Sequence, residues 1–116
     1  MSRSVLGDAF AHHGWATLRL IDACLALSPE QLGTAVAGTY GSIIETVRHL
    51  VAADSWYLFV MTGERTALTE ADQMDLRELR AAMEGHRAAW SRLAMDCTND
   101  AWADAWLASA RCRPAW

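Results

Sequence analysis

The fold of this chain is decided by residues 41–50, which have the sequence GSIIETVRHL. Ser42 is a favourable helix N-cap, and Glu45, three residues later, completes a capping box. The apolar residues of this region recur at helical spacing and do not alternate as in a strand: Ile43, Ile44, Val47, Leu50, Val51, Leu58 and Met61. Gly63 ends the pattern, because glycine readily adopts the left-handed conformation at a helix C-terminus. The stretch therefore predicts a capped helix that carries His49 about two turns inside it.

Three long helices are predicted, over residues 5–27, 42–62 and 72–96. The first has one apolar face, and the third has a heptad-like seam suited to bundle packing, made of Leu76, Leu79, Met83, His86, Trp90, Leu93 and Cys97. We expect an all-α fold, an up-down antiparallel helical bundle of three long helices and a short fourth element. It forms a single domain over residues 1–116, short at its C-terminal end.

The connections carry their own signals. Ser28 followed by Pro29 predicts a short helical turn after the first long helix. Thr69 and Asp72 indicate a cap for the third long helix, and the short last helix is expected over residues 101–110.

Composition excludes several classes of function. The 116 residues carry a net charge of −4 without a basic stripe, which argues against nucleic-acid binding. The most apolar window, residues 50–61, is too short to span a bilayer and contains Asp54. The N-terminus lacks the apolar core of a signal peptide, and three cysteines without ligand spacing suit a reducing compartment. We therefore expect a cytoplasmic protein without nucleic-acid or membrane partners.

Three segments, in the right order, resemble one known family. Residues 38–63, GTYGSIIETVRHLVAADSWYLFVMTG, resemble the second helix of the DinB-like superfamily. Residues 10–18, FAHHGWATL, resemble its opening helix, and residues 27–32, LSPEQL, resemble its short connector. Members of this superfamily are four-helix bundles, so the resemblance implies the same helical fold that the periodicity predicts.

The resemblance also implies a metal site. Many members bind a divalent metal through one histidine on the second helix and two histidines spaced i, i+4 on the last helix. His49 matches the first ligand. The C-terminal pair has no match, because the four histidines here are His12, His13, His49 and His86 and no two lie four apart. The resemblance therefore implies zinc, nickel or manganese at His49, in an incomplete site.

Two functions follow from these observations. The resemblance implies a metal-dependent enzyme, either a thiol S-transferase that uses a small-molecule thiol or a hydrolase, in which the metal would activate thiolate or water. The alternative is a non-catalytic helical bundle that self-associates or binds a partner. The missing histidine pair favours this alternative.

Each histidine also has a structural interpretation. His49 is either a metal ligand or another site histidine, or else a residue that is structural or faces solvent. His86 lies on the apolar seam of the third helix. The simpler interpretation is a core histidine that is hydrogen-bonded to a neighbour, and the alternative is a metal ligand. His13 faces the apolar side of the first helix and His12 faces outward, because successive helical residues diverge by about 100°.

Other residues allow further expectations. Asp54 needs a partner if it is buried, and Arg19 or Arg80 could provide it. Cys24 and Cys97 are expected to act as small hydrophobes.

Near the C-terminus, Cys112 lies between two arginines, which would favour its thiolate, although an unremarkable thiol is the simpler interpretation. Trp102 and Trp106 either cap the open end of the bundle or form an interface. Trp56 and Val60 lie opposite the main apolar stripe of their helix, which predicts a homodimer or a higher oligomer.

Overall fold

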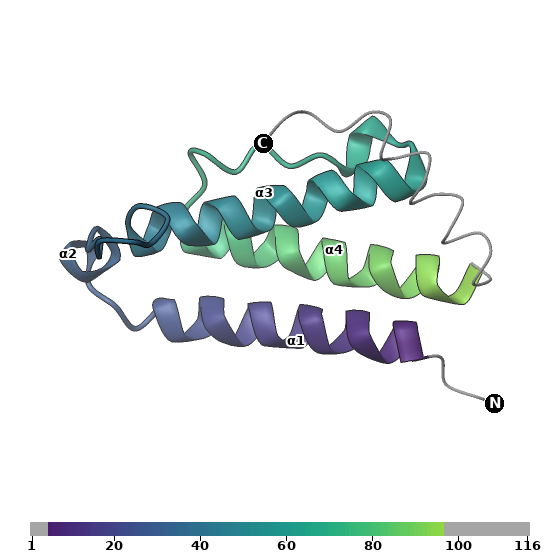
Figure 1. Cartoon of the computed structure of the whole chain (residues 1–116), viewed down its shortest axis with the longest axis horizontal. Helices are drawn as coiled ribbons and strands as arrows, with labels where there is room; N and C mark the ends of the chain where they lie inside the picture. The colour runs from purple at the N-terminus through teal and green to yellow at the C-terminus, as the bar shows by residue number, and fades with distance from the viewer. Residues whose placement is uncertain (1–4, 97–116) are drawn as a thin grey trace.

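The computed structural model describes residues 5–96, and this part of the chain is all-α. The elements are α1 (Val5–Cys24), α2 (Pro29–Leu32), α3 (Ile43–Thr62), the 3-10 turn η1 (Arg65–Ala67) and α4 (Leu76–Asp96). The three long helices lie side by side, and α4 packs against both α1 and α3 (Figure 1). The predicted helical bundle is therefore confirmed for the described residues.

The caps of α3 are those expected. The Ser42 side chain accepts a hydrogen bond from the Glu45 backbone N–H, and the Glu45 carboxylate accepts one from the Ser42 N–H at 2.8 Å. At the other end Gly63 has φ 73° and its N–H bonds the carbonyl oxygen of Phe59. A second capping box, between Ser28 and Gln31, begins α2. These bonds satisfy helix-terminal N–H and C=O groups that have no partner within the helix.

Two helix boundaries differ from the prediction. The first helix ends at Cys24 rather than residue 27, because i→i+3 bonds tighten its last residues and Pro29 disfavours helical backbone just before it. The third long helix begins at Leu76 rather than residue 72. Its cap is Asp75, whose carboxylate accepts the Glu78 N–H at 2.8 Å, so the assignment of the cap to Thr69 and Asp72 was wrong.

The core lies between the three long helices. Its fully buried side chains include Ile21 of α1, Val51 and Leu58 of α3, and Leu79 and Met83 of α4. Cys24 is buried in the same cluster, and burial raises the pKa of its thiol, so it acts as a small hydrophobe as expected.

Several sequence predictions fall outside residues 5–96. These are the last helix over residues 101–110 and the roles of Cys97, Trp102, Trp106 and Cys112. Among the described helices, none is long and apolar enough to cross a membrane.

Candidate functional site

A buried carboxylate, Asp54 of α3, is the centre of a polar cluster inside the bundle. Its side chain is only 5% exposed. Its Oδ1 atom lies 2.8 Å from Nε2 of His13 on α1 and accepts a hydrogen bond from Nε1 of Trp90 on α4 at 3.1 Å. One carboxylate thus joins all three long helices.

His86 of α4 lies between Asp54 and a hydroxyl group. Its Nδ1 is 2.9 Å from Asp54 Oδ2, close enough for an ion pair, although the geometry of this contact falls short of a hydrogen bond. Its Nε2 is 3.0 Å from Oγ1 of Thr69. The carboxylate favours a proton on Nδ1, which leaves Nε2 to accept a hydrogen bond from the Thr69 hydroxyl. The three side chains therefore lie in the order carboxylate, imidazole, hydroxyl.

The electrostatics of the cluster keep Asp54 ionised. Burial alone would raise the pKa of Asp54, but its contacts with His13 and His86 outweigh burial and lower the pKa from 3.8 to about 2. The bond with Asp54 in turn raises the pKa of His13 above 6.5, although partial burial opposes this. Neutral pH therefore leaves a negative charge within hydrogen-bonding distance of two imidazoles.

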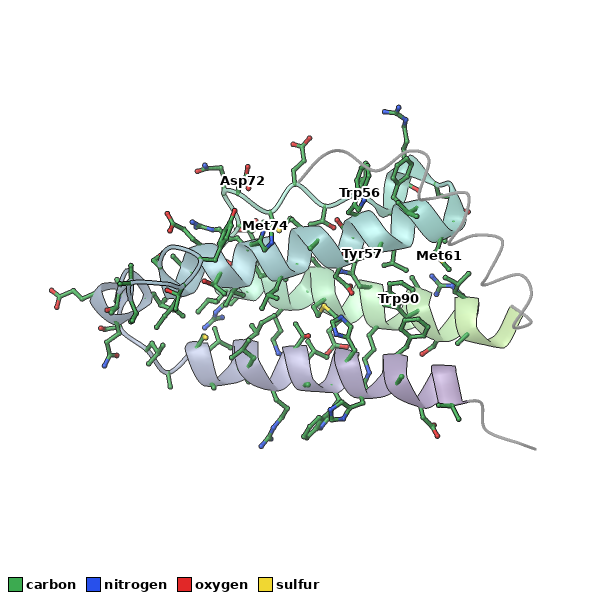
Figure 2. The ribbon with its side chains drawn as sticks, in the orientation of Figure 1. Trp56, Tyr57, Met61, Asp72, Met74 and Trp90 are labelled. Carbon is green, nitrogen blue, oxygen red and sulfur yellow. The ribbon has the colours of Figure 1, made fainter. Side chains whose placement is uncertain are left out.

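Neighbouring residues hold the members of the cluster in place. The backbone N–H of Thr69 donates to Ser55 Oγ at 2.9 Å, and Ser55 Oγ donates to the Ala52 carbonyl at 2.8 Å, which ties the loop before α4 to α3. The Trp90 ring stacks on Phe10 of α1, with centroids 4.4 Å apart. In Figure 2 Trp90 lies in the layer between α4 and α1.

A cavity of about 510 Å³ opens beside the Thr69 hydroxyl. Thr69 and His86 lie on its wall, together with small residues of α4 and the charged side chains of Glu64 and Arg92. His86 is 6% exposed overall, so it meets the cavity only at its edge. The imidazole can therefore exchange a proton with Thr69 or with a molecule in the cavity.

His49, the expected metal ligand, lies elsewhere. It is half-buried on α3 and stacks on Tyr40, with ring centroids 4.3 Å apart. It lines a separate cavity of about 580 Å³, whose wall also contains Glu45 and Asp72. The Glu45 carboxylate there is already bound to the Ser42 N–H at the start of α3.

The donors around His49 do not fit the metal site that the resemblance implies. That site needs two further imidazoles, and the other histidines of the sequence are His12, His13 and His86. Within residues 5–96, no group of three His, Cys, Asp or Glu side chains is placed to share a metal ion.

The other site predictions have mixed outcomes. His86 is a core histidine bonded to its neighbours, and His12 is exposed, as expected. Neither arginine pairs with Asp54: the Arg19 guanidinium lies over Trp15, and Arg80 pairs with Asp22 at 2.7 Å.

Thr69 was missed as a member of the site, because its sequence context indicates a cap. No local signal relates it to His86, which lies 17 residues away.

Comparison with known families identifies the class of protein. A sequence profile described as the DinB superfamily matches residues 13–112, which is most of the chain. The chain belongs to the DinB superfamily. No curated protein and no solved structure gave a significant match.

Proposed function

We propose that this chain is an enzyme of the transferase or hydrolase class that acts on a small molecule, and that His86, rather than a metal ion, moves the proton. One observation carries the proposal. The His86 imidazole lies between the ionised Asp54 and the Thr69 hydroxyl, at the wall of a cavity large enough for a small substrate.

The role of each residue in this proposal follows from its contacts. Asp54 fixes the tautomer of His86 and stabilises the imidazolium that forms when Nε2 takes a proton. His13 and Trp90 each contact Asp54 Oδ1, which holds the carboxylate in position. The nucleophile that loses its proton is a hydroxyl group, a water molecule or a small thiol. A transferase would use the thiol, and a hydrolase would use water.

Hydrolysis of p-nitrophenyl acetate tests the role of His86. We expect the purified chain to release p-nitrophenolate faster than buffer does. His86→Gln should lower the rate about a hundredfold. His12→Gln is the matched control, because His12 is exposed and remote from the cavity wall. An unchanged rate in a folded His86→Gln protein, checked by circular dichroism, would contradict the proposal.

The second candidate function is a module that binds another protein without catalysis. A surface group on α1 favours it: Trp15 is 51% exposed, the Arg19 guanidinium lies over its ring, and His12 packs beside it. Tryptophan and arginine are enriched at interface anchors. Trp15→Ala should weaken such binding, whereas His86→Gln should leave it unchanged, and a module of this kind should not accelerate the hydrolysis of p-nitrophenyl acetate.

A further inference from the structure

We propose that Thr69 is the nucleophile of this site and that it forms a covalent ester with the acyl group of a small ester or thioester substrate. This inference rests on the proposed function and deepens it. The observation behind it is the order Asp54, His86, Thr69, with contacts of 2.9 Å and 3.0 Å in succession. The same order of carboxylate, imidazole and hydroxyl activates serine in unrelated hydrolases.

The proton positions suit a nucleophile. A weakly acidic hydroxyl needs a base at hydrogen-bonding distance, and the Nε2 atom of His86 is 3.0 Å from Thr69 Oγ1. The groups that face His86 come from every element around it: Asp54 of α3, Thr69 of the preceding loop, and His13 of α1 acting through Asp54. The carboxylate is the charged group in direct contact with the ring, so it favours the imidazolium formed during attack.

Thr69 is held in place by bonds that leave its hydroxyl available. Its backbone N–H is fixed to Ser55 Oγ, and its side chain is half-buried at the cavity wall. A nucleophile must stay at a fixed distance from its base while its oxygen remains accessible to substrate. Thr69 meets both conditions.

The cavity wall indicates the class of substrate. Beside Thr69 and His86 it contains small side chains, including Ala82 and Ala89 of α4, together with the charged side chains of Glu64 and Arg92. A Cβ added at Gly85, on the same wall, would meet no described atom within 4 Å. A short acyl chain with an ester or thioester carbonyl fits this wall.

The reaction balances with the residues present and water. Thr69 Oγ1 attacks the carbonyl carbon while its proton moves to His86 Nε2. The bond from the carbonyl carbon to the leaving oxygen or sulfur breaks, and the imidazolium returns the proton to the leaving group. Water then attacks the carbonyl carbon of the ester on Thr69 and gives a proton to His86. The bond from this carbon to Thr69 Oγ1 breaks, and the imidazolium returns the proton to Oγ1, so that the free acid and the original enzyme are formed.

Acetylation by p-nitrophenyl acetate tests the proposal. We expect the wild-type chain, quenched in acid during turnover, to carry one acetyl group, and peptide mass spectrometry should locate it at Thr69. The sequence contains no lysine, so lysine acetylation cannot obscure the result. Thr69→Val keeps the shape of the side chain and should lower acetylation about a hundredfold, whereas Thr69→Ser should keep it. Thr34→Ala is the control, because Thr34 is an exposed threonine outside the cavity wall.

The outcomes separate the two proposals. Acetyl groups at other residues only, or equal acetylation in Thr69→Val, would overturn the role of Thr69. If hydrolysis still depends on His86 in that case, the proposed function stands and water is the nucleophile. The peptide map of the wild-type protein gives a result even if Thr69→Val fails to fold.

Discussion

His13 Nε2 lies 2.8 Å from Asp54 Oδ1, and this contact joins a half-exposed imidazole on α1 to a carboxylate on α3 that is 5% exposed. The same oxygen accepts the indole N–H of Trp90 from α4. A buried charge is tolerated only where other groups replace the water it has lost. One side chain of α3 therefore contacts residues of both α1 and α4, beside the apolar core that the three helices share.

The contact between His13 and Asp54 predicts that the stability of the fold depends on pH. The pKa of His13 is raised above 6.5 in the folded chain, so its contribution is fully present below pH 6.5 and is lost as the pH rises through the raised value. The pKa of Asp54 is lowered from 3.8 to about 2, so its contribution is present above pH 3.8 and is lost as the pH falls toward 2. The pair should stabilise the fold most between pH 3.8 and pH 6.5.

His13→Gln should lower the free energy of unfolding by up to about 1 kcal/mol at pH 6, since half of the His13 side chain is exposed and the pair is partly screened. The loss should shrink as the pH rises above neutrality. Urea titrations at a series of pH values measure it, with His12→Gln as the adjacent, exposed control. A constant difference between His13→Gln and wild type at all these pH values would show that the pair does not titrate as described.

Two glycines in helices predict opposite effects of the same substitution. A Cβ at Gly14 of α1 would lie 2.9 Å from Arg87 Cγ, whereas a Cβ at Gly85 of α4 would meet no described atom within 4 Å. Gly85→Ala should therefore stabilise the chain by about 0.5–1 kcal/mol, since alanine favours helix and glycine does not.

Gly14→Ala should stabilise the chain less than Gly85→Ala does, or should destabilise it. The reason is that Arg87 must move, and overpacking costs about 1–3 kcal/mol. Urea midpoints of the two variants provide the comparison. Equal stabilisation by both substitutions would mean that α1 and α4 are not in close contact at Gly14.

The sequence predicted the helices and most caps because those features are local. The Ser42–Glu45 box and Gly63 lie in one short stretch, and the structure contains both. The start of α4 was placed too early because Thr69, Asp72 and Asp75 are all good cap residues. Only Asp75 has a glutamate three residues later, Glu78, so the capping-box pattern of this pair was the sequence signal for the start of α4.

The candidate site was harder to predict because it is not local. Asp54 of α3 meets His13 of α1 and both His86 and Trp90 of α4, and these contacts depend on how far each helix is rotated. Sequence periodicity places His86 on a buried face but does not identify its neighbours. The arginines looked like natural partners for a carboxylate, yet a long charged side chain is more easily satisfied at the surface, as Arg80 is with Asp22.

The metal content of the purified chain is the third prediction. His49 alone supplies one imidazole, and one imidazole cannot hold a divalent ion against water. We expect elemental analysis to find far less than one zinc, nickel or manganese per chain, with no difference between wild type and His49→Ala. Close to one metal per chain, lost in His49→Ala but kept in His12→Ala, would contradict this prediction and would establish a centre at His49.

The last prediction concerns self-association, and we expect a homodimer at micromolar concentration. Trp56 lies on the side of α3 that faces away from α1 (Figure 2), and it packs against Phe59 with ring centroids 5.4 Å apart. Trp56 and Val60 are half-buried among the described residues, so apolar surface remains there for a partner. A two-fold arrangement would bury the same patch on both subunits, at about 25 cal/mol per Å² of apolar area before the costs of association.

Sedimentation velocity at tens of micromolar separates the two states. Wild type should sediment as a dimer of the 12.8 kDa chain, and Trp56→Glu should shift it to monomer because a carboxylate in the interface would lose its water. Arg65→Glu is the control, since Arg65 is exposed in η1 and its charge reversal leaves the Trp56 side of α3 unchanged. A wild-type chain that stays a sharp monomer would rule out the dimer, and dissociation by Arg65→Glu alone would place the contact at η1 instead.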